Sequence, residues 1–389
     1  MSKTKSGQGK IRYRLIYRLG SFLATFLLRK YRFDTNKIRK TDENYLVVSN
    51  HLTELDWLIL AAAFKEHMYF VAGEHLLRNK FGPKAQKWQD TIFVFKDAVA
   101  LDGVRTIVRR IKDGNNVVLF PEGSRSFSGV TEKLPTSIGK LAKLTGAGLI
   151  TYRIVGGYFV APRWAYTFRE GPVRGEIVHV YTAEEIRGMS PQEVTDHINA
   201  DIYENAYDRQ RKDPQVYKGV RLAEGLENYL VKCPVCGGYD TLKTEDDRFY
   251  CTACDLAGRY TEEAFLVGEN GADLPYDTVM DWGKWCENSM REDVLAMDAD
   301  KPCFTDANVT LYEVFEDHTQ KDLLSGEVIG YRDRIEIGGE VFAFADTSNV
   351  TMLYYGKSLL LNYQGRHLGI TGEAFHAIKY QTLYDVYGS

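Results

Sequence analysis

The stretch YLVVSNHLTELDWLILAAAF, residues 45–64, decides the fold of the first half of the chain. Its apolar opening, residues 45–48, predicts a short buried strand, and a helical pattern of apolar side chains begins near Thr53. His51 and Asp56 stand between these two elements, five residues apart. Five residues of a regular helix rotate by about 140°. The two side chains can therefore meet only if His51 lies in the loop and Asp56 in the first helical turn.

Such a contact would leave one ring nitrogen of His51 free to act as a base, because the Asp56 carboxylate would accept a hydrogen bond from the other. A structural role competes with this interpretation. Thr53 and Asp56 also fit the N-cap and N3 positions of a capping box, and aspartate is favoured in any first helical turn. The stretch by itself leaves both roles open.

A second strand and turn, NVVLFPEGSRS at residues 116–126, favours the catalytic role. An apolar strand leads there into a turn that gathers a carboxylate, a glycine and an arginine. The motifs NHLTELD (50–56) and FPEGSRS (120–126) together resemble those of the glycerolipid acyltransferases, which acylate glycerol phosphate and lysophosphatidate. The resemblance covers roughly residues 10–215 and does not extend to the remainder of the chain.

The resemblance implies that His51 is the general base, that Asp56 orients it, and that the acceptor alcohol attacks without a protein nucleophile. The residues that it places at the acceptor are Glu122, Gly123, Ser124, Arg125 and Lys96. Two departures put the acceptor in doubt. Lys96 stands where relatives carry an arginine that contacts the acceptor phosphate, and the fourth block, GLITYRIVGG at 148–157, has no proline.

The implied function is transfer of a fatty acyl group from acyl-CoA or acyl-carrier protein to a lysophospholipid, 1-acyl-glycerol-3-phosphate above all, in phospholipid biosynthesis. Glycerol 3-phosphate is an alternative acceptor, and a non-catalytic lipid-binding scaffold is the alternative from another class. A serine hydrolase is disfavoured because the sequence around Ser124, GSRS, lacks the second glycine of a nucleophile elbow. No catalytic cofactor is expected.

The positive charge of the chain is concentrated at its start. The first forty residues hold twelve Lys or Arg and one acid, Asp34, although the formal net charge of the whole chain is −4. This distribution disfavours a nucleic-acid partner, which would require basic residues over the folded domain.

The uncharged run 19–28 is too short to cross a bilayer, which takes about twenty residues. Residues 1–35 therefore predict a peripheral segment on an anionic membrane surface at the cytoplasmic face, or a helix docked on the protein core. No secretory signal is recognisable.

Two CxxC pairs in the second half predict a structural zinc ribbon at residues 228–262. Fourteen residues separate the pairs, and the four expected ligands are Cys233, Cys236, Cys251 and Cys254. Four thiolates at this spacing can surround one zinc ion in tetrahedral geometry. The absence of an open ligand position argues for a structural metal.

At 389 residues the chain is long enough for two or three domains. Strand and helix alternate through residues 36–215, which predicts an α/β layered domain with a mixed sheet flanked by helices, closed by one helix over 190–211. Residues 275–389 predict a helix, seven short strands and a last helix. This pattern resembles the small β-barrels of pleckstrin-homology-like or GRAM-like domains, which implies a lipid-headgroup or peptide ligand, although a packing or dimerisation module fits equally well.

Overall fold

The computed structural model describes residues 19–35, 43–64, 66–78, 91–94 and 101–388. The chain divides into two compact units. The first comprises Met1–Arg163 and Phe168–Lys218, and the second comprises Trp164–Thr167 and Gly219–Ser389. The predicted ribbon and the predicted β-rich domain both belong to the second unit.

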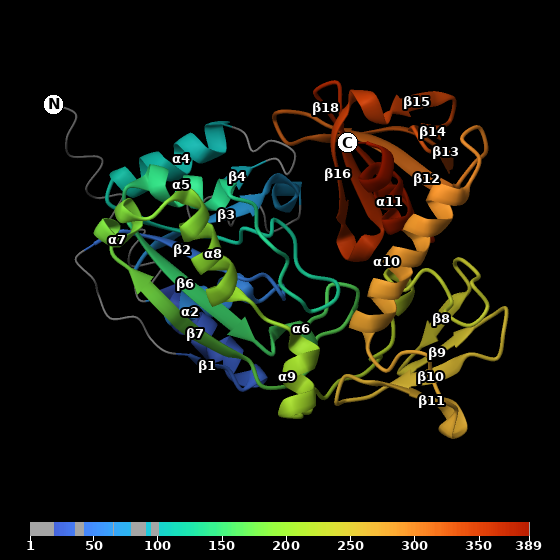
Figure 1. Ribbon diagram of the computed structural model, residues 1–389, viewed down its shortest axis with the longest axis horizontal. Coiled ribbons are helices and arrows are strands. Elements are labelled where there is room, and N and C mark those ends of the chain that lie inside the picture. The colour runs from blue at the N-terminus through green and yellow to red at the C-terminus, as the bar shows by residue number, and fades with distance from the viewer. Residues whose placement is uncertain (1–18, 36–42, 65, 79–90, 95–100, 389) are drawn as a thin grey trace. The chain divides into compact units, whose positions relative to one another are not determined.

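A seven-stranded mixed sheet, in the order β1-β7-β6-β2-β5-β3-β4, forms the centre of the first unit (Figure 1). Its strands are β1 (Asp34–Thr35), β2 (Tyr45–Ser49), β3 (Met68–Gly73), β4 (Ile92–Val94), β5 (Asn116–Leu119), β6 (Gly148–Val155) and β7 (Arg174–Tyr181). Neighbouring strands run parallel except β6 and β7, which are antiparallel. The predicted α/β class with a mixed sheet is confirmed.

Helices cover both faces of this sheet. They are α2 (Asp56–Ala63), α4 (Leu101–Lys112), α5 (Ser137–Thr145), α6 (Gly157–Val160), α7 (Ala183–Gly188), α8 (Pro191–Ile202) and α9 (Ala206–Lys212). Side chains alternate between the two faces along each strand. One face packs against α4, α5 and α8 in a core that includes Leu46, Val117 and Ile198. On the other face Phe64, directly after α2, lies against Tyr152 of β6 with ring centroids 6.0 Å apart.

Two predicted helix boundaries are wrong for identifiable reasons. The helix after β2 begins at Asp56 and not near Thr53, because hydrogen bonds to the Asp56 side chain hold the preceding residues in a turn. The single helix expected over 190–211 is two helices, α8 and α9. Between them the backbone of Glu204 exchanges hydrogen bonds with Thr131, and the Asn205 side chain caps α9. The predicted start of α8 is confirmed, since Ser190 and Glu193 form a capping box there.

The second unit contains the four-stranded ribbon sheet β11-β10-β9-β8, the helix α10 (Val279–Ala296) and a seven-stranded antiparallel sheet. The ribbon strands are β8 (Leu242–Glu245), β9 (Arg248–Cys251), β10 (Ala257–Tyr260) and β11 (Leu266–Gly268). The larger sheet has the order β15-β14-β13-β12-β18-β17-β16. Its strands are β12 (Phe304–Val314), β13 (Gln320–Gly330), β14 (Arg334–Ile337), β15 (Glu340–Ala343), β16 (Thr347–Leu353), β17 (Ser358–Tyr363) and β18 (Arg366–Thr371).

The seven strands predicted after residue 306 are confirmed, and a last helix, α11 (Ala377–Tyr387), follows them. Phe375, Tyr380 and Leu383 of the last segment pack into the apolar core of this sheet. The likeness to pleckstrin-homology-like or GRAM-like barrels stays a prediction.

A buried group of charges joins the ribbon to this β-rich part. Lys379 of α11, 1% exposed, donates to Asp240 of the ribbon at 2.7 Å and to Asp306 of β12 at 2.8 Å. His376 meets the other oxygen of Asp240, also at 2.7 Å. A buried ion pair contributes when each charge is matched and hydrogen bonded. These contacts therefore fix the ribbon against the sheet within the second unit.

The helix over residues 19–28 presents a continuous apolar stripe to solvent. Its members are Leu19, Phe22, Leu23, Phe26 and Leu27, each between 51% and 73% exposed. The i, i+3, i+4, i+7, i+8 spacing places them on one face, while Ala24 and Leu28 are buried. Within the described part of the chain, no helix is long and apolar enough to cross a membrane.

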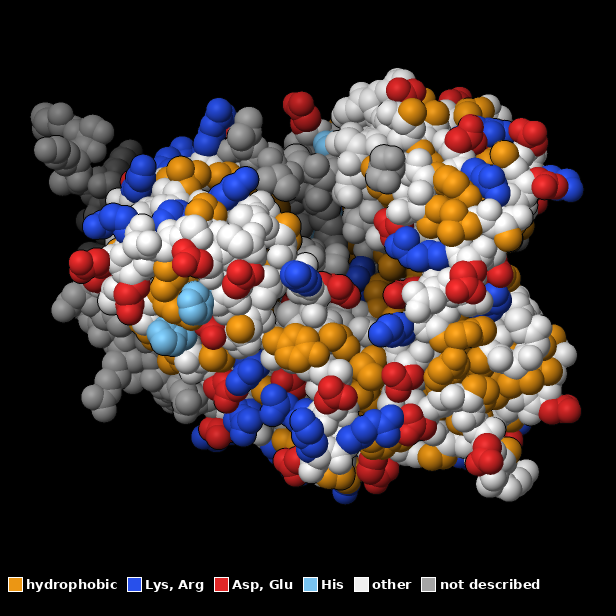
Figure 2. Space-filling model, in the orientation of Figure 1, with side chains coloured by type: hydrophobic (Ala, Val, Ile, Leu, Met, Phe, Trp, Pro, Cys, Tyr) orange, Lys and Arg blue, Asp and Glu red, His pale blue; other side chains and the backbone are white. Residues whose placement is uncertain are grey.

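On the face of the molecule seen in Figure 2, acidic and basic side chains are interspersed.

Candidate active site and metal centre

His51 and Asp56 meet at the carboxyl end of β2. The Nδ1 atom of His51 lies 2.7 Å from Oδ2 of Asp56, which is fully buried, whereas the histidine side chain is 24% exposed. The same carboxylate oxygen accepts the backbone N–H groups of Leu52 at 2.7 Å and Thr53 at 3.0 Å. The capping box considered as the alternative is not formed, because the N-cap of α2 is Leu55 and no side chain caps the helix. Asp56 nevertheless has a structural role as well as its contact with the imidazole, since it closes the turn before α2.

The loop that carries His51 is held on both sides. The side-chain amide of Asn50 donates to the carbonyl of Ile154 at 2.9 Å and accepts from its N–H at 2.8 Å, which ties the loop to β6. The ring of Phe120 stacks on the imidazole with centroids 4.4 Å apart. With Nδ1 facing the carboxylate, Nδ1 carries the proton and Nε2 is the basic nitrogen.

The register between β2 and β5 brings the second motif to the first. Leu46 pairs with Val117, an offset of seventy-one residues, and the same offset places Glu122 opposite His51. The N–H of His51 donates to Oε1 of Glu122 at 2.7 Å, and the N–H of Ser126 donates to the carbonyl of His51 at 3.0 Å. Since β2 and β5 are parallel, both turns open at the same edge of the sheet.

Glu122 is engaged by the backbone at both of its oxygens. Oε2 accepts the N–H of Glu132 at 3.1 Å, in addition to the bond that Oε1 accepts from His51. Burial raises the pKa of Glu122 to about 8; the two N–H donors oppose this rise, and the nearby Asp56 carboxylate adds to it. Near neutral pH, therefore, Glu122 is mostly protonated and adds little negative charge beside Asp56. Through these two hydrogen bonds, Glu122 connects the loop of His51 to the backbone at Glu132.

The other predicted acceptor residues lie in the same turn, with one exception. Gly123 adopts a left-handed φ of +68° that favours glycine. Ser124 separates it from Arg125, whose Nη2 lies 2.9 Å from Oε1 of Glu54. Lys96 lies outside the described residues. Two backbone amides of this turn already donate hydrogen bonds, Gly123 to the carbonyl of Phe120 and Ser126 to that of His51, so neither is available to stabilise an oxyanion.

The sequence did not point to Arg163, which the fold brings to this turn. Its Nη1 donates to the carbonyl of Arg125 at 2.9 Å, across thirty-eight residues. It lies in a loop after α6 without a motif around it, so only the tertiary fold identifies it. Asn50, by contrast, is part of the motif NHLTELD, but its bond to Ile154 depends on the sheet order.

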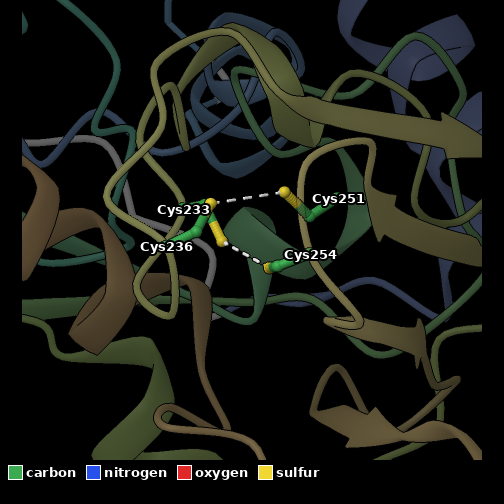
Figure 3. Close-up of side chains that lie close together, drawn as sticks. All are labelled: Cys233, Cys236, Cys251 and Cys254. Atoms are coloured by element: carbon green, nitrogen blue, oxygen red, sulfur yellow. Dashed lines mark hydrogen bonds between the residues drawn. The ribbon is translucent and has the colours of Figure 1, made fainter.

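The four predicted cysteine ligands converge in the second unit (Figure 3). All four Sγ atoms lie within 4.8 Å of one another, with 3.6 Å between Cys233 and Cys254 and 3.7 Å between Cys236 and Cys251. A tetrahedral site with zinc–sulfur bonds of about 2.3 Å requires sulfurs about 3.8 Å apart. The donor set therefore fits zinc. A turn in which the N–H of Gly237 donates to the carbonyl of Cys233 at 2.9 Å shapes the first pair.

The raised pKa of Glu122 predicts a stability that depends on pH. The folded protein retains a proton on this carboxyl up to about pH 8, whereas the unfolded chain releases it near its ordinary pKa of about 4.5. The unfolded state therefore binds fewer protons in this window, and the free energy of unfolding falls as pH rises. Urea titrations between pH 5 and pH 9 are expected to show that this decline is smaller in Glu122→Gln than in the wild type. Equal declines in both proteins would contradict the assignment. Asp102→Asn, which removes an exposed carboxylate on α4, is the control.

Residues 30–155 match the family model described as Acyltransferase. Among solved structures, the chain is similar to the 1-acyl-sn-glycerophosphate (LPA) acyltransferase PlsC from Thermotoga maritima. The identity is 21%, the similarity covers 51% of this chain and 80% of that chain, and the TM-score is 0.42. The family model spans both motifs of the site, NHLTELD and FPEGSRS.

Proposed function

We propose that the first unit transfers a fatty acyl group from a thioester, acyl-CoA or acyl-carrier protein, to the free hydroxyl of 1-acyl-glycerol-3-phosphate. The observation that carries this proposal is the 2.7 Å contact between Nδ1 of His51 and Oδ2 of Asp56 beside the turn of Glu122 and Arg125. The match of residues 30–155 to the acyltransferase family model supports it independently.

The reaction needs one base, which then acts as an acid. Nε2 of His51 takes the proton of the acceptor hydroxyl as its oxygen attacks the thioester carbonyl carbon. Asp56 stabilises the resulting imidazolium through Nδ1, as the acid does in a hydrolase triad, but without a covalent enzyme intermediate. The tetrahedral intermediate then expels the thiolate, which takes the proton from Nε2, and the products are an ester and a free thiol.

Arg125 is the residue of the turn best suited to the acceptor phosphate, because a guanidinium forms paired, charge-assisted hydrogen bonds with a phosphate. Its present partner, Glu54, is 42% exposed at the side chain. The side chain of Arg125 is only 17% exposed, so an acceptor phosphate would have to displace Glu54 from a half-buried ion pair. Glycerol 3-phosphate would offer the same phosphate, but the exposed apolar stripe of the helix over 19–28 favours an acceptor that resides in a membrane.

That helix is the proposed contact with the membrane. Arg29 and Lys30 follow its apolar stripe and suit an anionic lipid surface. We place the working enzyme at such a surface, on the cytoplasmic face, as a peripheral protein. Zinc bound by the four cysteines would hold the ribbon together, because four thiolates leave no position for a reactive water.

Loss of the proposed base gives the sharpest functional result. His51→Ala is expected to lower kcat for transfer from labelled acyl-CoA to lysophosphatidate by about 10²- to 10⁴-fold, the usual contribution of a general base. Asp56→Asn should lower it by a similar factor. Asp102→Asn, which removes an exposed carboxylate from α4, is the matched control and should retain full activity. An active His51→Ala enzyme would rule out the proposed chemistry, and failure of the wild type to acylate any lysolipid would favour the scaffold.

Metal content tests the ribbon. Protein expressed with zinc is expected to contain about one zinc ion per chain by mass spectrometry of the metal, because four thiolates complete one tetrahedral site. Cys233→Ser should lose it, whereas Cys303→Ser, at a half-buried thiol outside the cluster, should retain it. Zinc retained by Cys233→Ser, or absent from the wild type, would contradict the assignment.

Binding to vesicles tests the helix over 19–28. Replacing both Phe22 and Phe26 with serine should weaken binding to vesicles of phosphatidylglycerol and phosphatidylcholine at least about 100-fold, since burial of each ring contributes roughly 1.5–3 kcal/mol. The control, Val220→Ser with Val235→Ser, changes two exposed apolar residues elsewhere. Equal sedimentation of both double variants with vesicles would exclude this helix as the membrane contact.

A further inference from the structure

The second carboxylate oxygen of Asp56 has no hydrogen-bond donor among the described residues. Oδ2 accepts three hydrogen bonds, from the imidazole of His51 and from two backbone N–H groups, whereas Oδ1 is buried and accepts none. A buried polar atom without a partner is uncommon, because it bears the full cost of its removal from water. Such an exception beside the proposed base calls for a physical reason.

Gly157, two residues after β6, lies directly against this oxygen. A Cβ atom added at residue 157 would lie 3.8 Å from Oδ1 of Asp56, and only 3.1 Å from Cγ2 of Thr53 and of Ile154. The end of β6 is fixed in place, because the backbone of Ile154 exchanges two hydrogen bonds with the side chain of Asn50. A side chain at residue 157 would therefore press against the turn before α2.

The backbone conformation does not explain the glycine. Gly157 is the first residue of α6, and its φ lies outside the left-handed region, unlike that of Gly156, which is +76°. Alanine is the best helix former, and only proline is poorer than glycine. Residue 157 is thus a glycine because of the space that it leaves beside Asp56, and not because of its torsion angles.

We propose that Gly157 is a positioning residue that keeps Oδ1 of Asp56 without a donor, so that the charge of the carboxylate acts on Nδ1 of His51. This inference rests on the proposed acyl transfer and adds a residue to it. A hydrogen bond to a carboxylate stabilises its negative charge and so competes with its other partners. Without a donor at Oδ1, the carboxylate interacts more strongly with the imidazolium that forms when His51 takes the proton of the acceptor hydroxyl.

The competing role for Gly157 is steric only, as a residue that allows β6 to pack closely against the turn. The two roles make different predictions for alanine and serine. Both substitutions add a Cβ atom that crowds Thr53, but only serine brings a hydroxyl that can donate to Oδ1, from a Cβ atom 3.8 Å away. The difference between the two variants therefore isolates the effect of the donor.

The experiment compares Gly157→Ala with Gly157→Ser, each alone and in combination with Thr53→Ser. Thr53→Ser removes the crowded methyl group and keeps the hydroxyl that accepts the N–H of Leu55 at 3.3 Å. Gly188→Ala and Gly188→Ser are the controls, because a Cβ atom at this exposed glycine has no atom within 4 Å. Acyl transfer to lysophosphatidate is measured together with the NMR titration of His51, which does not depend on activity.

Gly157→Ser should have a kcat about 10-fold below that of Gly157→Ala with an unchanged KM, and its His51 should titrate about one pH unit lower, near the lower end of the effect of a hydrogen bond to a charged group. Adding Thr53→Ser should raise kcat toward the wild-type value in the alanine variant but not in the serine variant, because it relieves the crowding and leaves the donor. Glu122, the other carboxyl near Asp56, keeps its two backbone donors in all of these variants. The Gly188 variants should resemble the wild type.

Three results would overturn the inference. Equal kcat and equal titration of His51 in Gly157→Ala and Gly157→Ser would show that the role is steric, and a His51 that titrates higher in the serine variant would reverse the expected sign. If the single variants do not fold, the two double variants supply the same comparison. Double variants that also fail to fold would identify close packing as the reason for the glycine. If no lysolipid is acylated, the proposed function fails, but the NMR titration still decides about Gly157.

Discussion

In the first unit, the start of α2 and the orientation of His51 both depend on one carboxylate oxygen. Oδ2 of Asp56 receives hydrogen bonds from the imidazole of His51 and from two consecutive backbone N–H groups, and its side chain is fully buried. Three donors on one buried oxygen leave the carboxylate little freedom to rotate. Because the same contacts set the start of α2, the local fold and the orientation of the imidazole depend on one interaction. A structural and a chemical role for Asp56 are therefore inseparable.

The parallel register of β2 and β5 extends this arrangement to the second motif. It brings the Glu122 carboxyl to the N–H of His51, and burial keeps that carboxyl mostly neutral near pH 7. The site thus combines one buried carboxylate at the imidazole with two guanidinium groups at the neighbouring turn. This distribution of charge suits a reaction that forms an imidazolium on one side and holds an anionic acceptor on the other.

The sequence was informative wherever a local pattern determined the structure. The strand before His51, the start of a helix at residue 190 and the meeting of the four cysteines all follow from spacing and residue type. Prediction from the sequence was wrong where a tertiary contact ended an element that the local sequence pattern would have continued. The helical periodicity continues past Ile202, but the backbone of Glu204 bonds Thr131, so α8 ends there. Arg163 was not predicted either. Its loop carries no recognisable motif, and only the fold brings it to the turn of Arg125.

The central claim is that the Asp56 carboxylate holds the neutral His51 ring with its proton on Nδ1, so that Nε2 is the basic nitrogen. Nitrogen-15 NMR of histidine-labelled protein tests it directly, with the His51 signals identified by their loss in His51→Gln among the eight histidines of the chain. At a pH where the ring is neutral, the account predicts the tautomer protonated at Nδ1, and a shift toward the other tautomer in Asp56→Asn. A neutral His51 protonated at Nε2 in the wild type, or a tautomer unaffected by Asp56→Asn, would contradict it.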